Sequence, residues 1–153
     1  MEMIEFPLSD VAYEVINSFL LLAQTQNKIC LCNIQPMISF MGNEPAIRQL
    51  INILMDNALK YSPAYGTVSV SLQKQGRQIR FTVFNTTTAL VQKDRLNMIF
   101  ERFYRMDFSR NSQTGGHGIG LSIAKAIVNS HGGKISAATA DGNSLEITVQ
   151  FPV

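Results

Sequence analysis

Three polar side chains that could bind a metal-bound polyphosphate lie a short distance apart in the sequence. Asn57, Lys60 and Tyr61 are three and four positions apart, so a helix would place them on one face. An asparagine oxygen is a hard ligand suited to Mg²⁺, and a lysine ammonium pairs with phosphate oxygens. Taken alone, these side chains are also typical of an ordinary solvated helix end, which is the commoner case.

A glycine-rich segment later in the chain is a second candidate for phosphate binding. Residues 115–121 (GGHGIGL) lead directly into a predicted helix over residues 119–130. Glycines let the backbone approach a ligand closely, and the unpaired N–H groups at a helix N-terminus attract phosphate. The segment follows a long irregular stretch instead of the first strand, which excludes a Rossmann dinucleotide site. A glycine-rich hinge without a ligand is the alternative at this point.

Apolar spacing predicts the elements that must position these residues. Helical spacing predicts helices after a cap at Ser9, over residues 44–61 after a cap at Asn43, and over residues 119–130. Strand patterns cover residues 4–7, 28–34, 37–41 (a partner for 28–34), 67–73, 78–84, 134–140 and 145–151, the last two joined around Asp141-Gly142. This order predicts an α+β fold: a two-layer α/β sandwich in which three helices cover one face of one mixed sheet.

The composition fits one globular domain of 153 residues with its own core. Hydrophobic residues make up 46% and charged residues 16%, and the net charge of +2 is too small to favour a nucleic-acid or membrane-surface partner. Cys30 and Cys32 lie in a predicted strand, where we expect buried free thiols and no metal site. Without a membrane-spanning apolar run or a signal peptide, a soluble cytosolic domain is expected.

Three motifs together resemble the catalytic domain of bacterial sensor histidine kinases. Residues 56–63 (DNALKYSP) are similar to that family's asparagine box, and residues 100–105 (FERFYR) to its phenylalanine box. Residues 116–125 (GHGIGLSIAK), followed by residues 131–133 (HGG), are similar to its distal glycine box. One box alone would be weak, but three in the family's order and spacing outweigh the ordinary interpretations given above.

The resemblance implies the Bergerat ATP-binding fold of the GHKL superfamily, with ATP and Mg²⁺ as cofactors. It implies that Asn57 is the metal ligand and that Asn57, Lys60 and Arg105 are the catalytic residues. The implied nucleotide-binding residues are Asn57, Lys60, Tyr61, Asn85, Arg105, Gly116, Gly118, Ile119, Gly120 and Leu121. Residues 85–116 would form the family's ATP lid.

The sequence departs from the family pattern in ways that bear on nucleotide affinity. Asn85 stands where the family has an aspartate that accepts the adenine amino group; an asparagine oxygen can accept it too, but without the charge. Thr87 and Ala89 replace lid glycines, so we expect a stiffer first hinge. Ile53 replaces a second asparagine four residues before Asn57, which removes a possible metal or phosphate contact.

The activity that the resemblance implies is transfer of the terminal phosphoryl group of ATP to a histidine on an upstream dimerisation helix. Neither His117 nor His131 stands in the sequence context of that acceptor, so the phosphoacceptor and sensor regions are expected outside this sequence. The implied partners are the dimerisation helices of the same protein and, indirectly, a response regulator, without nucleic acid. The full-length protein would be a membrane-anchored homodimer with this domain in the cytoplasm.

Two other functions remain open on the sequence. A Bergerat-fold ATPase or serine kinase would carry a glutamate at the position of Ile53 to activate water or a hydroxyl. Asp56 is a poor substitute because it lies about 100° around the helix from Asn57. A nucleotide-binding module with degenerate or lost catalysis is favoured by Asn85 and the missing lid glycines. It is disfavoured by the intact Asn57, Lys60, Arg105 and glycine loop.

Overall fold

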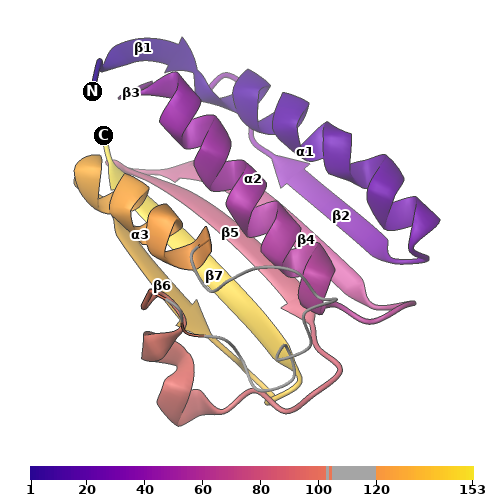
Figure 1. Ribbon diagram of the computed structural model, residues 1–153. Helices are drawn as coiled ribbons and strands as arrows, with labels where there is room; N and C mark the ends of the chain where they lie inside the picture. The colour runs from indigo at the N-terminus through magenta and orange to yellow at the C-terminus, as the bar shows by residue number, and fades with distance from the viewer. Residues whose placement is uncertain (103, 105–119) are drawn as a thin grey trace.

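The computed structural model describes residues 1–102, 104 and 120–153, which form two layers. The elements are β1 (Ile4–Pro7), α1 (Leu8–Thr25), β2 (Ile29–Ile34), β3 (Ser39–Gly42), α2 (Glu44–Tyr61), β4 (Thr67–Gln75), β5 (Gln78–Thr86), the 3-10 helix η1 (Lys93–Met98), α3 (Gly120–Ser130), β6 (Lys134–Ala138) and β7 (Ser144–Pro152). Helices α1, α2 and α3 lie over one face of a sheet with the strand order β2-β4-β5-β7-β6 (Figure 1). Because β2 and β4 are parallel and the other pairs antiparallel, the predicted mixed α+β sandwich is confirmed.

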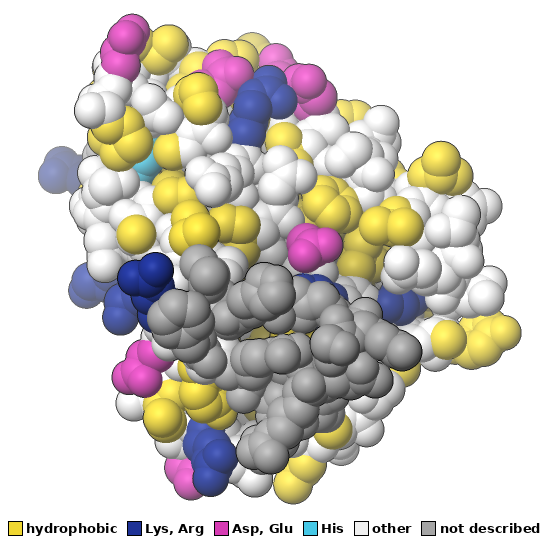
Figure 2. All heavy atoms as spheres, viewed as in Figure 1, with side chains coloured by type: hydrophobic (Ala, Val, Ile, Leu, Met, Phe, Trp, Pro, Cys, Tyr) yellow, Lys and Arg dark blue, Asp and Glu magenta, His cyan; other side chains and the backbone are white. Residues whose placement is uncertain are grey.

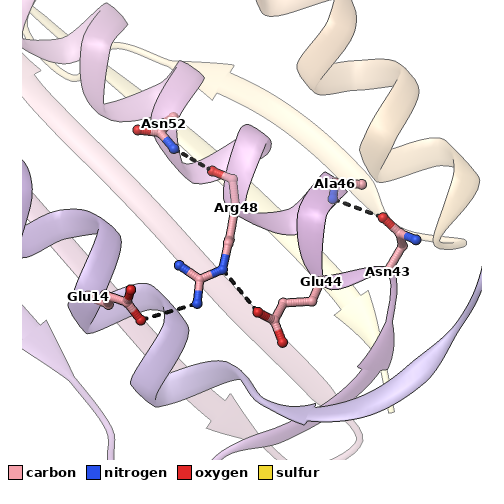
Figure 3. Close-up of polar contacts among 6 residues, drawn as sticks. All are labelled: Glu14, Asn43, Glu44, Ala46, Arg48 and Asn52. Atoms are coloured by element: carbon pink, nitrogen blue, oxygen red, sulfur yellow. Dashed lines mark hydrogen bonds and ion pairs between the residues drawn. The ribbon is translucent and has the colours of Figure 1, made fainter.

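Helix α2 has the bounds that its capping residue and apolar spacing predict. The side chain of Asn43 accepts a hydrogen bond from the backbone N–H of Ala46 (2.9 Å), which satisfies one of the open donors of the first turn. On the same helix, Arg48 pairs with Glu44 (3.0 Å) and with Glu14 of α1 (3.1 Å), as Figure 3 shows. These contacts join α1 and α2 at the end of α2 that lies away from its three polar candidates.

Alternation along the sheet buries one face against the helices. In β5, Ile79, Phe81 and Val83 are buried, whereas the side chains between them are partly exposed. The same period places Asn85 on the buried face, at the end of this strand. A polar side chain that continues a core register is unusual and marks this end of β5 as a possible site.

The prediction that Ser9 caps the first helix is wrong. Helix α1 begins at Leu8, and Pro7 before it provides no side-chain cap. The Ser9 hydroxyl instead donates to the carbonyl oxygen of Gln35 (2.6 Å) and accepts from the backbone N–H of Ile38 (2.9 Å). These tertiary hydrogen bonds satisfy both capacities of a buried hydroxyl, so they prevail over the local cap.

The prediction that residues 37–41 pair with residues 28–34 is also wrong. Strand β3 pairs antiparallel with β1 in a separate two-stranded sheet, and β2 pairs in parallel with β4. Phe40 of β3 packs against Phe6 of β1, with ring centroids 6.0 Å apart, and against Phe151 of β7, at 4.9 Å. Burial of these three rings favours the observed pairing, and sequence spacing alone does not reveal it.

The cysteines lie on an edge strand and are less buried than the sequence predicted. Among the residues that the structure describes, β2 pairs in the sheet with β4 alone. Cys30 is half-buried and Cys32 is exposed, so the prediction of buried thiols is wrong, whereas the prediction that both are free is confirmed. Partial desolvation raises the pKa of both thiols, and Cys32 raises that of Cys30 further.

The outer surface mixes apolar and charged side chains. Figure 2 shows acidic, basic and apolar side chains interspersed over the described part of the face that carries the helices. Across the ranges that the structure describes, no helix combines the length and the apolar character that crossing a membrane requires.

His131 ties the end of α3 to the start of α2. Its Nε2 accepts a hydrogen bond from the backbone N–H of Asn43 (3.1 Å), and its Nδ1 lies 2.8 Å from the carbonyl oxygen of Ile127. This arrangement requires a neutral ring with the proton on Nδ1. The ring also stacks on Phe40 and meets Phe151 edge-on. The end of α3 is thereby held at the start of α2, which leaves the start of α3 over the later turns of α2 (Figure 1).

Candidate functional site

Helix α2 presents the candidate residues beside its core stripe. The predicted stripe is confirmed, since Leu50, Ile51, Leu54, Met55 and Ala58 are all at most 2% exposed. Asn57, Lys60 and Tyr61 are half-buried on the neighbouring face, near the C-terminal end of the helix. Rigid packing of the stripe fixes the direction in which these three side chains point. Asn57, Lys60 and Tyr61 thus lie on one face of α2, as their spacing predicts.

Asn57 has the properties of a side chain kept available for a ligand. Within the described parts of the chain, its carboxamide makes no hydrogen bond, although the side chain is half-buried. An amide oxygen in this position has lone pairs for a hard cation such as Mg²⁺. The remaining ligands of such an ion would come from phosphate oxygens and water, as is usual for Mg²⁺ sites.

Lys60 has an acidic neighbour on the same helix. Its Nζ lies 3.9 Å from Oδ2 of Asp56 one turn earlier, and its side chain is 21% exposed. At this distance the ion pair is weak, so the ammonium can turn toward a phosphate at little cost. Asp56 is mostly exposed and lies on a different face from Asn57, which fits its predicted exclusion as a general base.

The start of α3 passes directly over α2, one turn before Asn57. A Cβ atom added at Gly120 would lie 3.6 Å from Cγ2 of Ile53, so the backbone of α3 begins next to that side chain. Ile53 is partly buried and packs against the core. Of the predicted phosphate cradle, Gly120 is exposed and Leu121 is half-buried at this helix start. The structure thus brings the end of the glycine loop to the asparagine helix.

Four of the predicted site residues lie outside the described residues. These are Arg105, Gly116, Gly118 and Ile119. Of the others, Asn57, Lys60 and Tyr61 belong to α2, and Gly120 at the start of α3 lies next to Ile53 of that helix.

Asn85 reaches the same region from the sheet. It is 2% exposed and faces the helix layer. Its neighbour Thr86 accepts a hydrogen bond from the backbone N–H of Thr67 (3.0 Å), and a Cβ at Gly66 would lie 2.6 Å from the Thr86 hydroxyl. Gly66 belongs to the turn that follows the end of α2, so the end of β5 and the end of α2 are adjacent. Figure 1 shows both at the same side of the molecule.

The amide of Asn85 is oriented by its own backbone. Its Nδ2 donates to the carbonyl oxygen of Thr86 (3.0 Å), which leaves Oδ1 as the group that can accept from a ligand. An acceptor suits an exocyclic amino group such as that of adenine, whereas a guanine carbonyl would require a donor. The hydrogen bond from Nδ2 therefore favours Asn85 as an acceptor toward the ligand, which is the role of the aspartate in the family pattern.

The first part of the predicted lid is fixed by hydrogen bonds. Strand β5 continues to Thr86, so the first two residues of the predicted lid segment belong to the sheet. The Thr87 hydroxyl donates to the carbonyl oxygen of Ala89 (2.8 Å), which closes a turn where relatives of the family pattern have glycines. Beyond η1, Phe100 is 7% exposed and Tyr104 packs partly against the core. The stiffer first hinge stays a prediction.

Lys28 and a set of buried polar residues were not identified from the sequence. The Lys28 ammonium donates to the carbonyl oxygen of Leu59 at the end of α2, and burial lowers the pKa of this lysine. Thr87, Thr139 and Ser144 are each less than 10% exposed around the start of β7. Lys28 lies far from α2 in sequence, so no local pattern signals its contact, and Ser144 falls on the face of β7 opposite Leu145, Ile147 and Val149, so alternation does not predict its burial either.

Comparisons with known proteins agree with this geometry. The chain matches the family described as histidine kinase-, DNA gyrase B-, and HSP90-like ATPase over residues 42–153. It is 37% identical over 116 residues to the signal transduction histidine-protein kinase BaeS of Escherichia coli, covering 76% of this chain and 25% of that protein. It is 33% identical over 146 residues to the sensor protein DltS of Streptococcus agalactiae, covering 95% of this chain and 36% of that protein.

Solved structures share the fold. The nucleotide-free catalytic domain of histidine kinase ThkA matches with a TM-score of 0.86 at 23% identity, covering 99% of this chain and 96% of that one. The mycobacterial sensor histidine kinase MprB matches with a TM-score of 0.80 at 20% identity, covering 98% and 97%. The chain spans only a quarter of the length of BaeS. By its sequence and its fold, the chain belongs to the family of histidine kinase-, DNA gyrase B- and HSP90-like ATPases.

Proposed function

We propose that this chain is the ATP-binding catalytic domain of a sensor histidine kinase and that it binds Mg-ATP. The observation that carries the proposal is the half-buried carboxamide of Asn57, without a partner in the described chain, where α2, the start of α3 and the end of β5 meet. The carboxamide remains accessible, so it has lone pairs and donors available for a ligand. The relatives BaeS and DltS, named as a histidine-protein kinase and a sensor protein, support this assignment.

Different residues of this site would bind the metal ion, the phosphates and the base. Asn57 would hold Mg²⁺, which neutralises charge on the phosphates during transfer. Lys60, Tyr61 and Arg105 would contact phosphate oxygens, and the backbone N–H groups of residues 116–121 would cradle the terminal phosphates. Asn85 would accept the adenine amino group through Oδ1.

The acceptor would be a histidine elsewhere in the full-length protein. His131 is engaged on both ring nitrogens by structural contacts, so it is not available as a nucleophile. The proposed partners are the dimerisation helices that carry the acceptor and, downstream, a response regulator; ThkA has been solved in complex with the response regulator TrrA. We further propose a membrane-anchored homodimer with this domain on the cytoplasmic side.

Labelling with radioactive ATP tests the proposed kinase activity. The full-length protein should gain a label that is lost in acid and kept in base, as expected for phosphohistidine. The isolated 153-residue chain should neither label itself nor release phosphate steadily, because Ile53 leaves no general base at the position used by ATPases. Steady phosphate release by the isolated chain that Asp56→Asn abolishes would instead assign it to the ATPases.

A nucleotide-binding module without catalysis is the second candidate. The uncharged Asn85 and the hydrogen-bonded start of the lid favour it, because both features alter the base-binding side of the site. Such a module would bind Mg-ATP, yet the full-length protein would carry no acid-labile label. The same labelling experiment therefore separates the two candidates.

The variant Asn85→Asp should bind ATP more tightly and fold less stably. A charged acceptor makes the stronger hydrogen bond to the adenine amino group, which predicts a gain of roughly fivefold in affinity. The aspartate would also lose the hydrogen bond to the Thr86 carbonyl, at a cost of about 1–3 kcal/mol in unfolding free energy. Calorimetric titration with ATP and GTP, together with urea unfolding, measures both effects.

Thr88→Asp is the matched control for Asn85→Asp. Thr88 is exposed three residues later, so it adds the same charge nearby without the buried acceptor position. If both variants changed ATP affinity equally, the effect would be general electrostatics and Asn85 would not contact the base. If Asn85→Asp bound ATP and GTP equally poorly, this too would show that Asn85 does not contact the base.

A further inference from the structure

The turn between β6 and β7 holds the segment that follows Asn85. The backbone N–H of Thr87 donates to the carbonyl oxygen of Asn143 (2.9 Å), and that of Val91 donates to the carbonyl oxygen of Gly142 (2.6 Å). Thr87 and Val91 are each 7% exposed. Two buried hydrogen bonds thus fix residues 87–91 to a turn that lies about fifty residues later in the chain.

Side-chain hydrogen bonds give this turn its shape. Oδ1 of Asp141 accepts from the backbone N–H of Asn143 and from the hydroxyl of Ser144, both at 2.9 Å. The backbone N–H of Gly142 donates to the Thr139 hydroxyl (3.0 Å). The two bonds to Asp141 hold its pKa below the usual range, so the carboxylate is ionised at neutral pH. The 139–144 turn is therefore preorganised to present two carbonyl oxygens to residues 87–91.

The turn and the segment are also in close contact. Gly142 has a φ of +81°, which a residue with a side chain rarely adopts. A Cβ atom at Gly142 would lie 2.9 Å from Cδ1 of Leu90. The contact continues into the sheet, where Thr86 pairs with Ser144 and Asn85 pairs with Leu145. The contacts between residues 87–91 and the 139–144 turn therefore continue directly from the β5–β7 pairing, which ends at Thr86 and Ser144.

We propose that the 139–144 turn is a positioning element that holds residues 87–91 in place and so sets the affinity of the base-binding side of the site. This inference rests on the proposed function, because it assigns Asn85 and the residues after it to nucleotide binding. Release of the turn would let residues 87–91 sample other conformations, and apparent affinity falls with the fraction of molecules in the binding-competent state. Asp141 influences nucleotide binding only by shaping the turn that holds residues 87–91, and it does not contact the nucleotide.

Hydrogen exchange and nucleotide titration on the purified chain test the proposal. Asp141→Ala should speed exchange of the Thr87 and Val91 amides without nucleotide and weaken Mg-ATP binding roughly three- to tenfold. Asp141→Asn retains an acceptor oxygen and should keep most of both properties. Because Asp141 is exposed, its replacement should leave exchange in β4 and in α2 unchanged.

A pair of glycine variants separates this effect from general backbone strain. Gly142→Ala and Gly76→Ala both place alanine at a positive φ, +81° and +61°. A Cβ atom at Gly76 would have no atom within 4 Å, and Gly76 lies in the distant β4–β5 turn. Only Gly142→Ala should change exchange at residues 87–91 and nucleotide affinity. Both should lower stability because of the positive φ, and Gly142→Ala more so because its Cβ also meets Leu90.

Two outcomes would overturn the proposal. One is unchanged exchange at residues 87–91 in both Asp141→Ala and Gly142→Ala. The other is faster exchange with unchanged Mg-ATP affinity, which would make the turn merely structural. If the unmodified chain failed to bind Mg-ATP at all, the proposed function itself would be wrong and the role of the turn in binding would fall with it.

Discussion

Replacing Asn57 by alanine should abolish most Mg-ATP binding and leave the fold intact. The side chain is half-buried beside the core stripe, and it is the proposed protein ligand of Mg²⁺. Removing a residue that merely supports a metal ligand costs about 10- to 100-fold in affinity, so removing the ligand itself should cost at least as much. Calorimetric titration with ATP, with and without Mg²⁺, measures the loss.

Asn52 provides the matched control on the same helix. It is an exposed asparagine whose amide donates to the carbonyl oxygen of Arg48 (3.0 Å), away from the site. Asn52→Ala should leave the affinity for Mg-ATP unchanged. Both variants should unfold at nearly the same urea concentration as the unmodified chain, since alanine is a good helix former. Equal ATP affinity in Asn57→Ala and the unmodified chain would remove Asn57 from the site.

Replacing Leu54 by alanine should destabilise the whole domain. Leu54 is completely buried in the stripe that packs α2 against the sheet. A Leu→Ala change in such a position costs about 2–5 kcal/mol, because transfer energy is lost and a cavity remains. Against a typical total stability of about 5–15 kcal/mol, this loss should be visible as a large shift of the urea midpoint.

The pattern of effects across α2 distinguishes packing from ligand binding. Leu54→Ala should lower Mg-ATP affinity only through the unfolded fraction, so saturating Mg-ATP should restore part of the lost stability. Asn57→Ala should show the opposite behaviour, with normal stability and no stabilisation by Mg-ATP. A loss below 1 kcal/mol in Leu54→Ala would mean that the helix repacks and that its stripe does not fix the site.

Local signals in the sequence were sufficient for the elements that carry the site. The cap at Asn43 and the apolar period define α2 to the residue, because a capped amphipathic helix needs no distant partner to set its register. Strands β4 and β5 follow from alternation and the turn between them for the same reason. Residue type and helical spacing indicated Asn57 and Lys60 as candidates for binding a metal-bound phosphate, and the order of the motifs then identified the family.

Local signals did not predict which strand lies at the edge of the sheet or which strands pair. Cys32 reads as a strand residue, but its exposure depends on β2 having a neighbour on one side only. The pairing of β3 with β1 depends on the burial of Phe40 against rings from two distant strands. The hydrogen bonds of Ser9 likewise depend on a loop that its own neighbours in sequence do not specify.

The sequence by itself determined the helix faces, the alternation of the central strands and the residue types available for a nucleotide, since each depends on neighbours within a few positions. Only the tertiary structure decided how these pieces meet. It placed the start of α3 over Ile53, oriented the amide of Asn85 and fixed residues 87–91 to the 139–144 turn. Contacts between segments so far apart in the chain arise from packing, and no local propensity encodes them.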